Sequence, residues 1–353
     1  MRPHVLGLLP DALAAHLRGA GVALRDDEAR RLCSLRFSRE GDPRPVRPLS
    51  RVLVGRVAEL TDDAPLELVE RARDPDDGFV KYLFRAADGA LFEAVRIPLH
   101  RAGAFSVCLS SQVGCAMGCD FCATGRLGFS RNLEAWEMVA QLGAVRRDVA
   151  AEGGRVTGAV FQGQGEPLAN YDAVIAAARV LSHPTCGRIA GRNITISTVG
   201  LPAHIRRYAA DGHPYRLIVS LHSAVLPRRQ RLLPVAGRAS LTELAEAIRA
   251  YAARTRDRVT IAWTLLGGEN DGADEARALA ELLPDVPLRL NLIDVNDPRP
   301  GGYRRATDAE RKAFMEALQP LRAPIVRRYS GGAGRDAACG MLAAQRGGPP
   351  RLS

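Results

Sequence analysis

The sequence predicts an α/β fold in which an open, partial (β/α)6 barrel follows a small helical N-terminal accessory domain. After about residue 106, apolar strand-like runs alternate with segments of helical periodicity, whereas the N-terminal part is helical and interrupted by prolines. A chain of 353 residues is also long enough for one large domain and an accessory piece. A doubly wound open sheet is the alternative arrangement of the same β–α units.

The predicted accessory domain covers residues 1–75. Helical periodicity is visible over residues 8–21 and 26–37, and three prolines between positions 43 and 48 separate these segments from a further apolar run. Residues 76–105 follow as a predicted β-hairpin region. Its two alternating strands flank an Asp-Gly pair at positions 88 and 89, which favours a two-residue hairpin turn.

Residues 106–345 form the predicted barrel, and residues 346–353 are predicted to be a disordered tail. Helical stretches separate the strand candidates, so successive strands are expected to be parallel. The strand candidates are residues 107–111, 158–163, 193–198, 216–222, 259–266, 288–293 and 325–329.

Composition and charge restrict the class of protein. No run approaches the roughly 18–20 apolar residues of a membrane span, and we expect a cytoplasmic protein with no membrane contact. Seven cysteines, an odd number, do not resemble a secreted disulfide framework. A net charge of +10 and an isoelectric point of about 9.7 favour a polyanionic partner, of which nucleic acid is the commonest.

Cys115, Cys119 and Cys122 are the most informative residues in the chain. Their C-x3-C-x2-C spacing lets three thiolates bind three irons of a [4Fe–4S] cluster from one loop. The fourth iron would remain open for S-adenosylmethionine (SAM), as in radical-SAM enzymes. A zinc knuckle is the alternative, but zinc sites usually have a second C-x2-C-like half, which this sequence lacks.

Several polar residues fall at the ends of predicted strands. The carboxyl ends of parallel strands meet at one edge of a sheet, where ligands of such proteins bind. A zwitterionic ligand with a ribose needs carboxylate, hydroxyl and amide partners of this kind. The residues are Gly165, Glu166, Ser197, Ser220, His222 and Asn296.

Seven segments, in this order, resemble the RlmN/Cfr family of radical-SAM RNA adenine methyltransferases, and in particular its RlmN-like, dual-specificity members. The resemblance extends from about residue 90 to 345, around 70% of the chain. The matching segments are SSQVGCAMGCDFCATGRLGFSRNL, GQGEPLANYD, ITISTVG, IVSLHSA, NLIDVN, GGYRR and DAACGML.

The resemblance implies roles for individual residues. The three motif cysteines would ligate the cluster. Cys339 would carry a methyl group, Cys108 would resolve a covalent intermediate, and Glu93 would accept a proton. The residues that would contact SAM are Gly165, Glu166, Ser197, Ser220, Leu221, His222 and Asn296.

The resemblance also implies the reaction and the partners. The expected product is 2-methyladenosine in large-subunit ribosomal RNA, and some members also modify tRNA next to the anticodon. The expected enzyme is a monomer that receives one electron from a donor such as flavodoxin or ferredoxin. Carbon-8 methylation is the alternative, although Pro167 in GEP favours carbon 2. A divergent paralogue that acts on another substrate, or only binds RNA, also remains open.

Two features depart from the family pattern. Gln162 and Gln164 occupy positions around the Glu-Pro motif where the family usually has methionine, and two amides there would change the polarity beside SAM. The segment after the VSLH strand is also unusually rich in arginine. We expect Arg228, Arg229 and Arg231 to contact RNA phosphates, with a solvated helix turn as the alternative.

Overall fold

The computed structural model describes residues 2–42, 44–255, 257–297, 299–328, 331–332 and 336–342. The predicted tail at 346–353 and the last residues of the predicted barrel, 343–345, lie outside this part of the chain. Within the described ranges, no helix has the length and apolar character needed to cross a bilayer.

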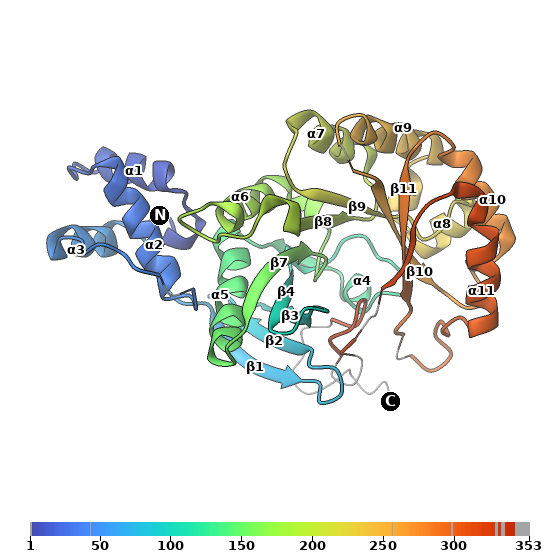
Figure 1. Ribbon diagram of the computed structural model, residues 1–353, viewed down its shortest axis with the longest axis horizontal. Helices are drawn as coiled ribbons and strands as arrows, with labels where there is room; N and C mark the ends of the chain where they lie inside the picture. Colours follow the sequence, from blue (N-terminus) through green and yellow to red (C-terminus); the bar gives the residue numbers. More distant parts are fainter. Residues whose placement is uncertain are drawn as a thin grey trace.

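A ten-stranded open sheet forms the frame of the molecule (Figure 1). The neighbouring strands of its first part, from β1 to β4, are antiparallel, and every pairing from β4 to β12 is parallel. The strands, in spatial order, are β1 (Glu67–Arg73), β2 (Val80–Arg85), β3 (Leu91–Pro98), β4 (Ala104–Leu109), β7 (Arg155–Phe161), β8 (Ile194–Thr198), β9 (Arg216–Ser220), β10 (Val259–Leu265), β11 (Leu288–Asp294) and β12 (Ile325–Arg328).

Each step from one parallel strand to the next passes through a helix, which confirms the predicted α/β fold with repeating β–α units. These helices lie around the outside of the curved sheet (Figure 1). Capping boxes mark two of their starts, at Ser240 with Glu243 and at Thr307 with Glu310. The connecting helices are α5 (Ala135–Ala151), α6 (Tyr171–Ser182), α7 (Pro202–Asp211), α9 (Leu241–Ala252), α10 (Ala273–Leu282) and α11 (Asp308–Ala317).

The N-terminal segment contains the helices α1 (Pro10–Gly19), α2 (Asp26–Ser38) and α3 (Arg51–Leu60). It contacts α5, where the rings of His4 and Trp136 stack with centroids 4.0 Å apart. Glu40, just after α2, forms ion pairs with Arg36 and with Arg147 of α5. The accessory segment therefore packs directly against the first connecting helix of the barrel.

The predicted helical character of residues 1–75 does not extend to the end of that range, because residues 67–73 form β1. This strand pairs with β2 and lies at the edge of the sheet. Its sequence, ELVERAR, has charged residues on both faces, as edge strands often do, and so lacks the alternation that identifies a half-buried strand. The predicted hairpin is confirmed by β2 and β3, and Asp88 Oδ1 accepts a hydrogen bond from the Ala90 N–H at 3.0 Å in its turn.

A separate two-stranded sheet closes the loop that contains the motif cysteines. It consists of β5 (Gln112–Gly114) and β6 (Phe129–Asn132), and the short helix α4 (Ala123–Leu127) lies between them. Only glycine fits at position 114, because its φ is +70° and an added Cβ would lie 1.9 Å from the Gly128 oxygen. This close approach brings the two ends of the cysteine loop together.

Candidate active site

A cleft lies at the carboxyl ends of the parallel strands and contains about 750 Å³ of space. It brings together the residues expected at the ligand-binding rim, although they come from four different strand ends, from the cysteine loop and from the C-terminal segment. The expected site residues that line it are Cys119, Cys122, Gly165, Glu166, Ser197, Ser220, His222, Asn296 and Cys339.

The three motif cysteines gather beside this cleft. Cys115 and Cys119 are buried among apolar side chains that include Leu232 and Leu266, and Cys122 is half-buried. Burial raises the pKa of the Cys115 thiol to about 12 and that of Cys119 well above its usual value, and the nearby Cys122 raises both further. Thiolates crowded in this way require a cationic centre.

This arrangement fits an iron–sulfur cluster. In the described part of the chain, no group of three His, Cys, Asp or Glu side chains is placed to hold a single metal ion. A cubane cluster bonds each thiolate to a different iron, so its ligands need not converge on one point. Cys119 and Cys122 also line the same cleft as the strand-end residues, so a cluster held by these thiolates would lie beside the expected SAM site.

Glu166 is held rigidly at the bottom of the cleft. Its Oε1 accepts a hydrogen bond from the Leu168 N–H at 2.9 Å, and its Oε2 accepts one from the Val199 N–H at 2.8 Å. Burial nevertheless raises the pKa of this carboxyl to about 7. The preceding Gly165 has a φ of +98°, and an added Cβ would lie 2.5 Å from the side chain of Gln112. The carboxylate is therefore aimed by the backbone of two strand-end loops.

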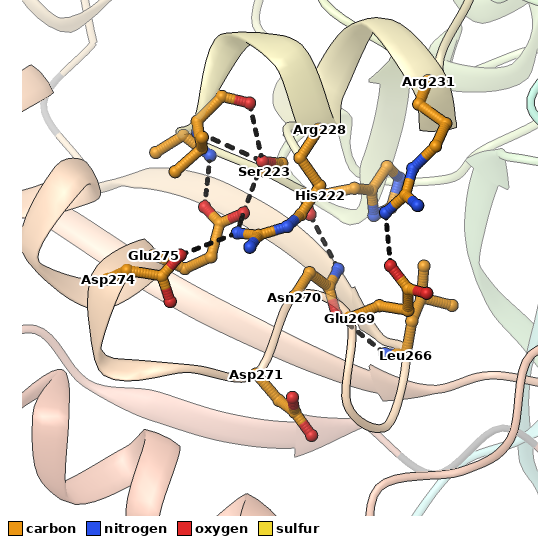
Figure 2. A network of polar contacts seen from close by, with 12 residues as sticks. His222, Ser223, Arg228, Arg231, Leu266, Glu269, Asn270, Asp271, Asp274 and Glu275 are labelled. Atoms are coloured by element: carbon orange, nitrogen blue, oxygen red, sulfur yellow. Dashed lines mark hydrogen bonds and ion pairs between the residues drawn. The ribbon is translucent and has the colours of Figure 1, made fainter.

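His222 presents a fixed hydrogen-bond donor to the cleft. Its Nδ1 accepts a hydrogen bond from the Thr264 N–H at 2.9 Å, so the proton of the neutral ring lies on Nε2. Burial lowers the pKa of this imidazole to about 3, and therefore it stays neutral at physiological pH. The side-chain amide of Asn270 donates to the His222 carbonyl at 2.7 Å, as Figure 2 shows.

Three further expected SAM contacts differ in how they meet the cleft. The hydroxyls of Ser197 and Ser220 lie 3.2 Å apart on adjacent strands, and Asn296 follows β11 at the same rim. Leu221, in contrast, is absent from the cleft lining and packs in the main hydrophobic core. Its backbone N–H is already bonded to the Ala262 oxygen at 3.1 Å. The side chain of Leu221 therefore lies in the core and not at the cleft, and its expected contact with SAM stays a prediction.

A second cavity of about 590 Å³ contains both of the remaining expected catalytic cysteines. Cys108 lies on β4, opposite Val95 of β3. Cys339 lines this cavity and the first cleft, together with Cys122, and also packs against Ile218 and Ala262 on the inner face of the sheet. Cys339 thus lies in the wall that the two cavities share.

Glu93 is fully buried and is not part of the lining of this second cavity. It lies two residues before Val95 on β3, so its side chain shares a face of the sheet with Cys108. Its Oε1 lies 3.2 Å from the Nζ of Lys81 on β2. An ion pair thus contributes to holding this carboxylate near the cysteine.

The two glutamines of the GQGEP motif have different environments. Gln162 lines both cavities, whereas Gln164 is buried and its Oε1 accepts the Glu93 N–H at 3.2 Å. The expected polarity change beside SAM therefore concerns Gln162 only.

The three arginines of α8 (Leu226–Leu232) are held by protein partners. Arg228 forms ion pairs with Asp274 and Glu275, and Arg231 with Glu269 (Figure 2). The expected phosphate contact is wrong for Arg229, which is fully buried and donates to the carbonyls of Leu221 and, at 2.7 Å, Val199. Arg229 and Asn270 instead fix the backbone around the cleft. Nothing in the local sequence distinguishes them from exposed polar residues.

Comparisons with known proteins agree with this geometry. Residues 109–283 match the model of the radical SAM superfamily. A probable RNA methyltransferase of Anaeromyxobacter sp. is 47% identical over 97% of this chain and 99% of its own length. The dual-specificity RNA methyltransferase RlmN of Syntrophobacter fumaroxidans is 43% identical over 79% of this chain and 80% of its own. The crystal structure of a radical SAM methyltransferase from Sphaerobacter thermophilus superposes with a TM-score of 0.87 and 34% identity, covering 97% of this chain and 100% of the other.

Proposed function

We propose that this chain, which belongs to the RlmN/Cfr family of radical-SAM RNA methyltransferases, methylates carbon 2 of an adenosine in RNA. The family membership brings a [4Fe–4S] cluster and SAM as cofactors. The observation that carries the proposal is the position of Cys339, which lines both the cleft beside the cluster cysteines and the cavity that contains Cys108.

A carrier cysteine is needed because the target carbon of adenine is a poor nucleophile. Carbon 2 of adenine is electron-poor and cannot attack the methyl group of SAM, whereas a thiolate can. Cys339 would accept the methyl group by displacement and hold it in the shared wall of the two cavities. When bound, the cluster and SAM would supply a 5′-deoxyadenosyl radical able to remove hydrogen from the methyl group on Cys339, so that this carbon could bond to the base.

Cys108 and Glu93 would complete the reaction. The adduct that forms with the new carbon–carbon bond is a radical joined to Cys339 through a thioether. It must lose one electron, which the oxidised cluster would accept, and the ring carbon must lose its proton. Glu93, on the same face of the sheet as Cys108, would take this proton. Attack of the Cys108 thiol on the Cys339 sulfur converts a thioether and a thiol into a methyl group and a disulfide.

The remaining assignments rest on the family resemblance and on one residue. Pro167, in GEP, lines the cleft and favours carbon 2 over carbon 8. The proposed targets are an adenosine of large-subunit ribosomal RNA and one next to a tRNA anticodon. We expect a cytoplasmic monomer that draws its electron from flavodoxin or ferredoxin.

Two alanine variants test the carrier scheme, because each cysteine acts at a different step. Cys339→Ala should give no methylated protein and no RNA adduct. Cys108→Ala should still methylate Cys339 and attack the base, and then accumulate protein linked to RNA. The measurement is a denaturing gel with labelled RNA, combined with mass analysis of the Cys339 peptide.

Cys186→Ala is the matched control, since Cys186 is buried outside both cavities. It should turn over normally without trapped RNA. Normal turnover by Cys108→Ala would overturn the scheme. Chromatography of the digested product against 2-methyladenosine and 8-methyladenosine standards identifies the carbon, and 8-methyladenosine would refute the choice of carbon 2.

A further inference from the structure

We infer that Thr124 is a positioning residue that clamps the segment bearing Cys339, here residues 336–342, against the cluster loop. The inference rests on the proposed function, because it concerns how the carrier cysteine reaches its place. It depends on hydrogen bonds between α4 and the C-terminal segment, which lie more than 200 residues apart in the sequence.

Two hydrogen bonds join α4 to this segment. The Thr124 hydroxyl donates to the Leu342 carbonyl at 2.7 Å, and the Ala123 N–H donates to the Gly340 carbonyl at 2.7 Å. Thr124 is 3% exposed, so water competes little for its hydroxyl. The two donors are the first and second residues after Cys122, and Gly340 directly follows Cys339. The clamp therefore ties the carrier residue to the loop that would hold the cluster.

The other side of the segment is held by packing and by a turn near β2. Ala337 and Leu342 pack against Phe79 and Val95. The Ala337 N–H donates to the Gly332 carbonyl at 2.8 Å, and the Gly332 N–H donates to Asp77 Oδ2 at 2.7 Å. These contacts restrain the segment laterally, whereas those from α4 set its distance from Cys122.

A carrier thiol must meet the methyl group of SAM in a narrow geometry, and displacements of about 1 Å can cost orders of magnitude in rate. The residues expected to bind SAM lie on other strand ends and do not include Thr124. Loss of its hydroxyl should therefore slow methyl transfer to Cys339 without weakening SAM binding. Backbone donation from Ala123 remains in any Thr124 variant, so the effect should be partial.

The test compares Thr124→Val, which has a similar volume but no donor, with Thr124→Ser, which keeps the hydroxyl. The first readout needs no cluster: amide hydrogen exchange of the peptide that contains residues 336–342, and the alkylation rate of Cys339 by a neutral maleimide. In Thr124→Val both rates should rise about five- to tenfold, the effect of one lost buried hydrogen bond. Thr124→Ser should stay within about twofold of the wild type.

Thr61→Val is the matched control, because the Thr61 hydroxyl is also buried and also donates to a carbonyl at 2.7 Å, here that of Val57 at the C-terminal end of α3. It should leave both rates unchanged. The second readout is single-turnover methylation of Cys339, which should fall about tenfold in Thr124→Val with SAM affinity unchanged.

Unchanged exchange and alkylation in Thr124→Val, or equal changes in Thr61→Val, would overturn the inference. Failure of the proposed function gives a different result: the wild type itself would then show no methylated Cys339, while the exchange data would still decide whether the clamp exists.

Discussion

Glu166 and His222 show how one cause, burial in the cleft, acts on two residues of opposite charge type. Desolvation disfavours the charged form of each, so it raises the pKa of the carboxyl to about 7 and lowers that of the imidazole to about 3. Backbone N–H groups aim both side chains, from Val199 toward Glu166 and from Thr264 toward His222. The cleft therefore offers one carboxylate of adjustable charge and one neutral donor.

The affinity for SAM should fall as the pH drops below about 7. With a pKa near 7, the Glu166 carboxyl is protonated at lower pH. The positively charged amino group of SAM would favour the ionised carboxylate of Glu166, so at low pH this carboxyl must lose its proton when SAM binds. This requirement should weaken binding about tenfold between pH 8 and pH 6. The measurement is anaerobic equilibrium dialysis of SAM with the cluster-loaded protein.

Glu166→Gln separates this effect from the titration of SAM itself, which is the same in both proteins. The variant should bind SAM more weakly and with a shallower dependence on pH. His222 adds nothing, because it stays neutral throughout this range. Identical slopes for the variant and the wild type would exclude Glu166 as the titrating partner.

The residues of the cleft could largely be predicted from the sequence, because cysteine spacing and strand-end position are local signals. Burial was harder to predict. Leu221 lies between Ser220 and His222, yet only its two neighbours face the cleft, and this alternation appears only once the strand end is placed in the sheet. Gln162 and Gln164 differ in the same way.

At the scale of the element, α8 shows why a high density of arginine in the sequence does not by itself identify residues that contact RNA. Its arginines appear equivalent in the sequence, but one is fully buried and another, Arg231, has a 57% exposed side chain. A helix that packs against the strand-end loops must turn one face inward, and the side chain of Arg229 lies on that face. The buried guanidinium of Arg229 is stabilised there because it donates hydrogen bonds to the two strand-end carbonyls of Leu221 and Val199.

Replacing these two arginines should therefore have very different effects on the free energy of unfolding. Arg229→Met leaves the carbonyls of Val199 and Leu221 without their donor and should cost about 3 kcal/mol. Arg231→Ala removes only an exposed ion pair with Glu269 and should cost less than about 1 kcal/mol. Urea denaturation of both variants measures the difference. Equal costs would show that Arg229 is not buried as described.

The edge strand β1 could not be predicted from its own sequence, for a related reason. The hairpin before the barrel could be predicted from Asp88 and Gly89, because turn chemistry is local. In β1 the register is set by partners on β2, such as Glu67 opposite Arg85, whose side chains lie 2.9 Å apart. Such pairing cannot be seen in the segment alone.

At the scale of the molecule, the net charge of +10 should make RNA binding strongly dependent on salt. Each phosphate that the protein neutralises releases counterions, so about three or four contacts would weaken binding roughly forty- to 150-fold between 50 and 200 mM KCl. Filter binding of a labelled tRNA measures this slope. A slope near zero would contradict an electrostatic interface, and SAM binding under the same salts provides the comparison.

The close approach of Gly114 and Gly128 has a consequence for how the enzyme acquires and keeps its metal. The Cys115 N–H donates a hydrogen bond to the Gly128 carbonyl at 2.8 Å, and β5 pairs with β6. Backbone hydrogen bonds therefore hold the two ends of the cysteine loop together. Around it, Leu232, Leu233 and Leu266 are fully buried. A zinc finger, in contrast, owes its fold to its ion. In this protein the contacts that join the ends of the loop involve no metal, so we expect the loop to keep its fold when the cluster is lost. A cluster destroyed by oxygen could then be rebuilt on the same folded chain.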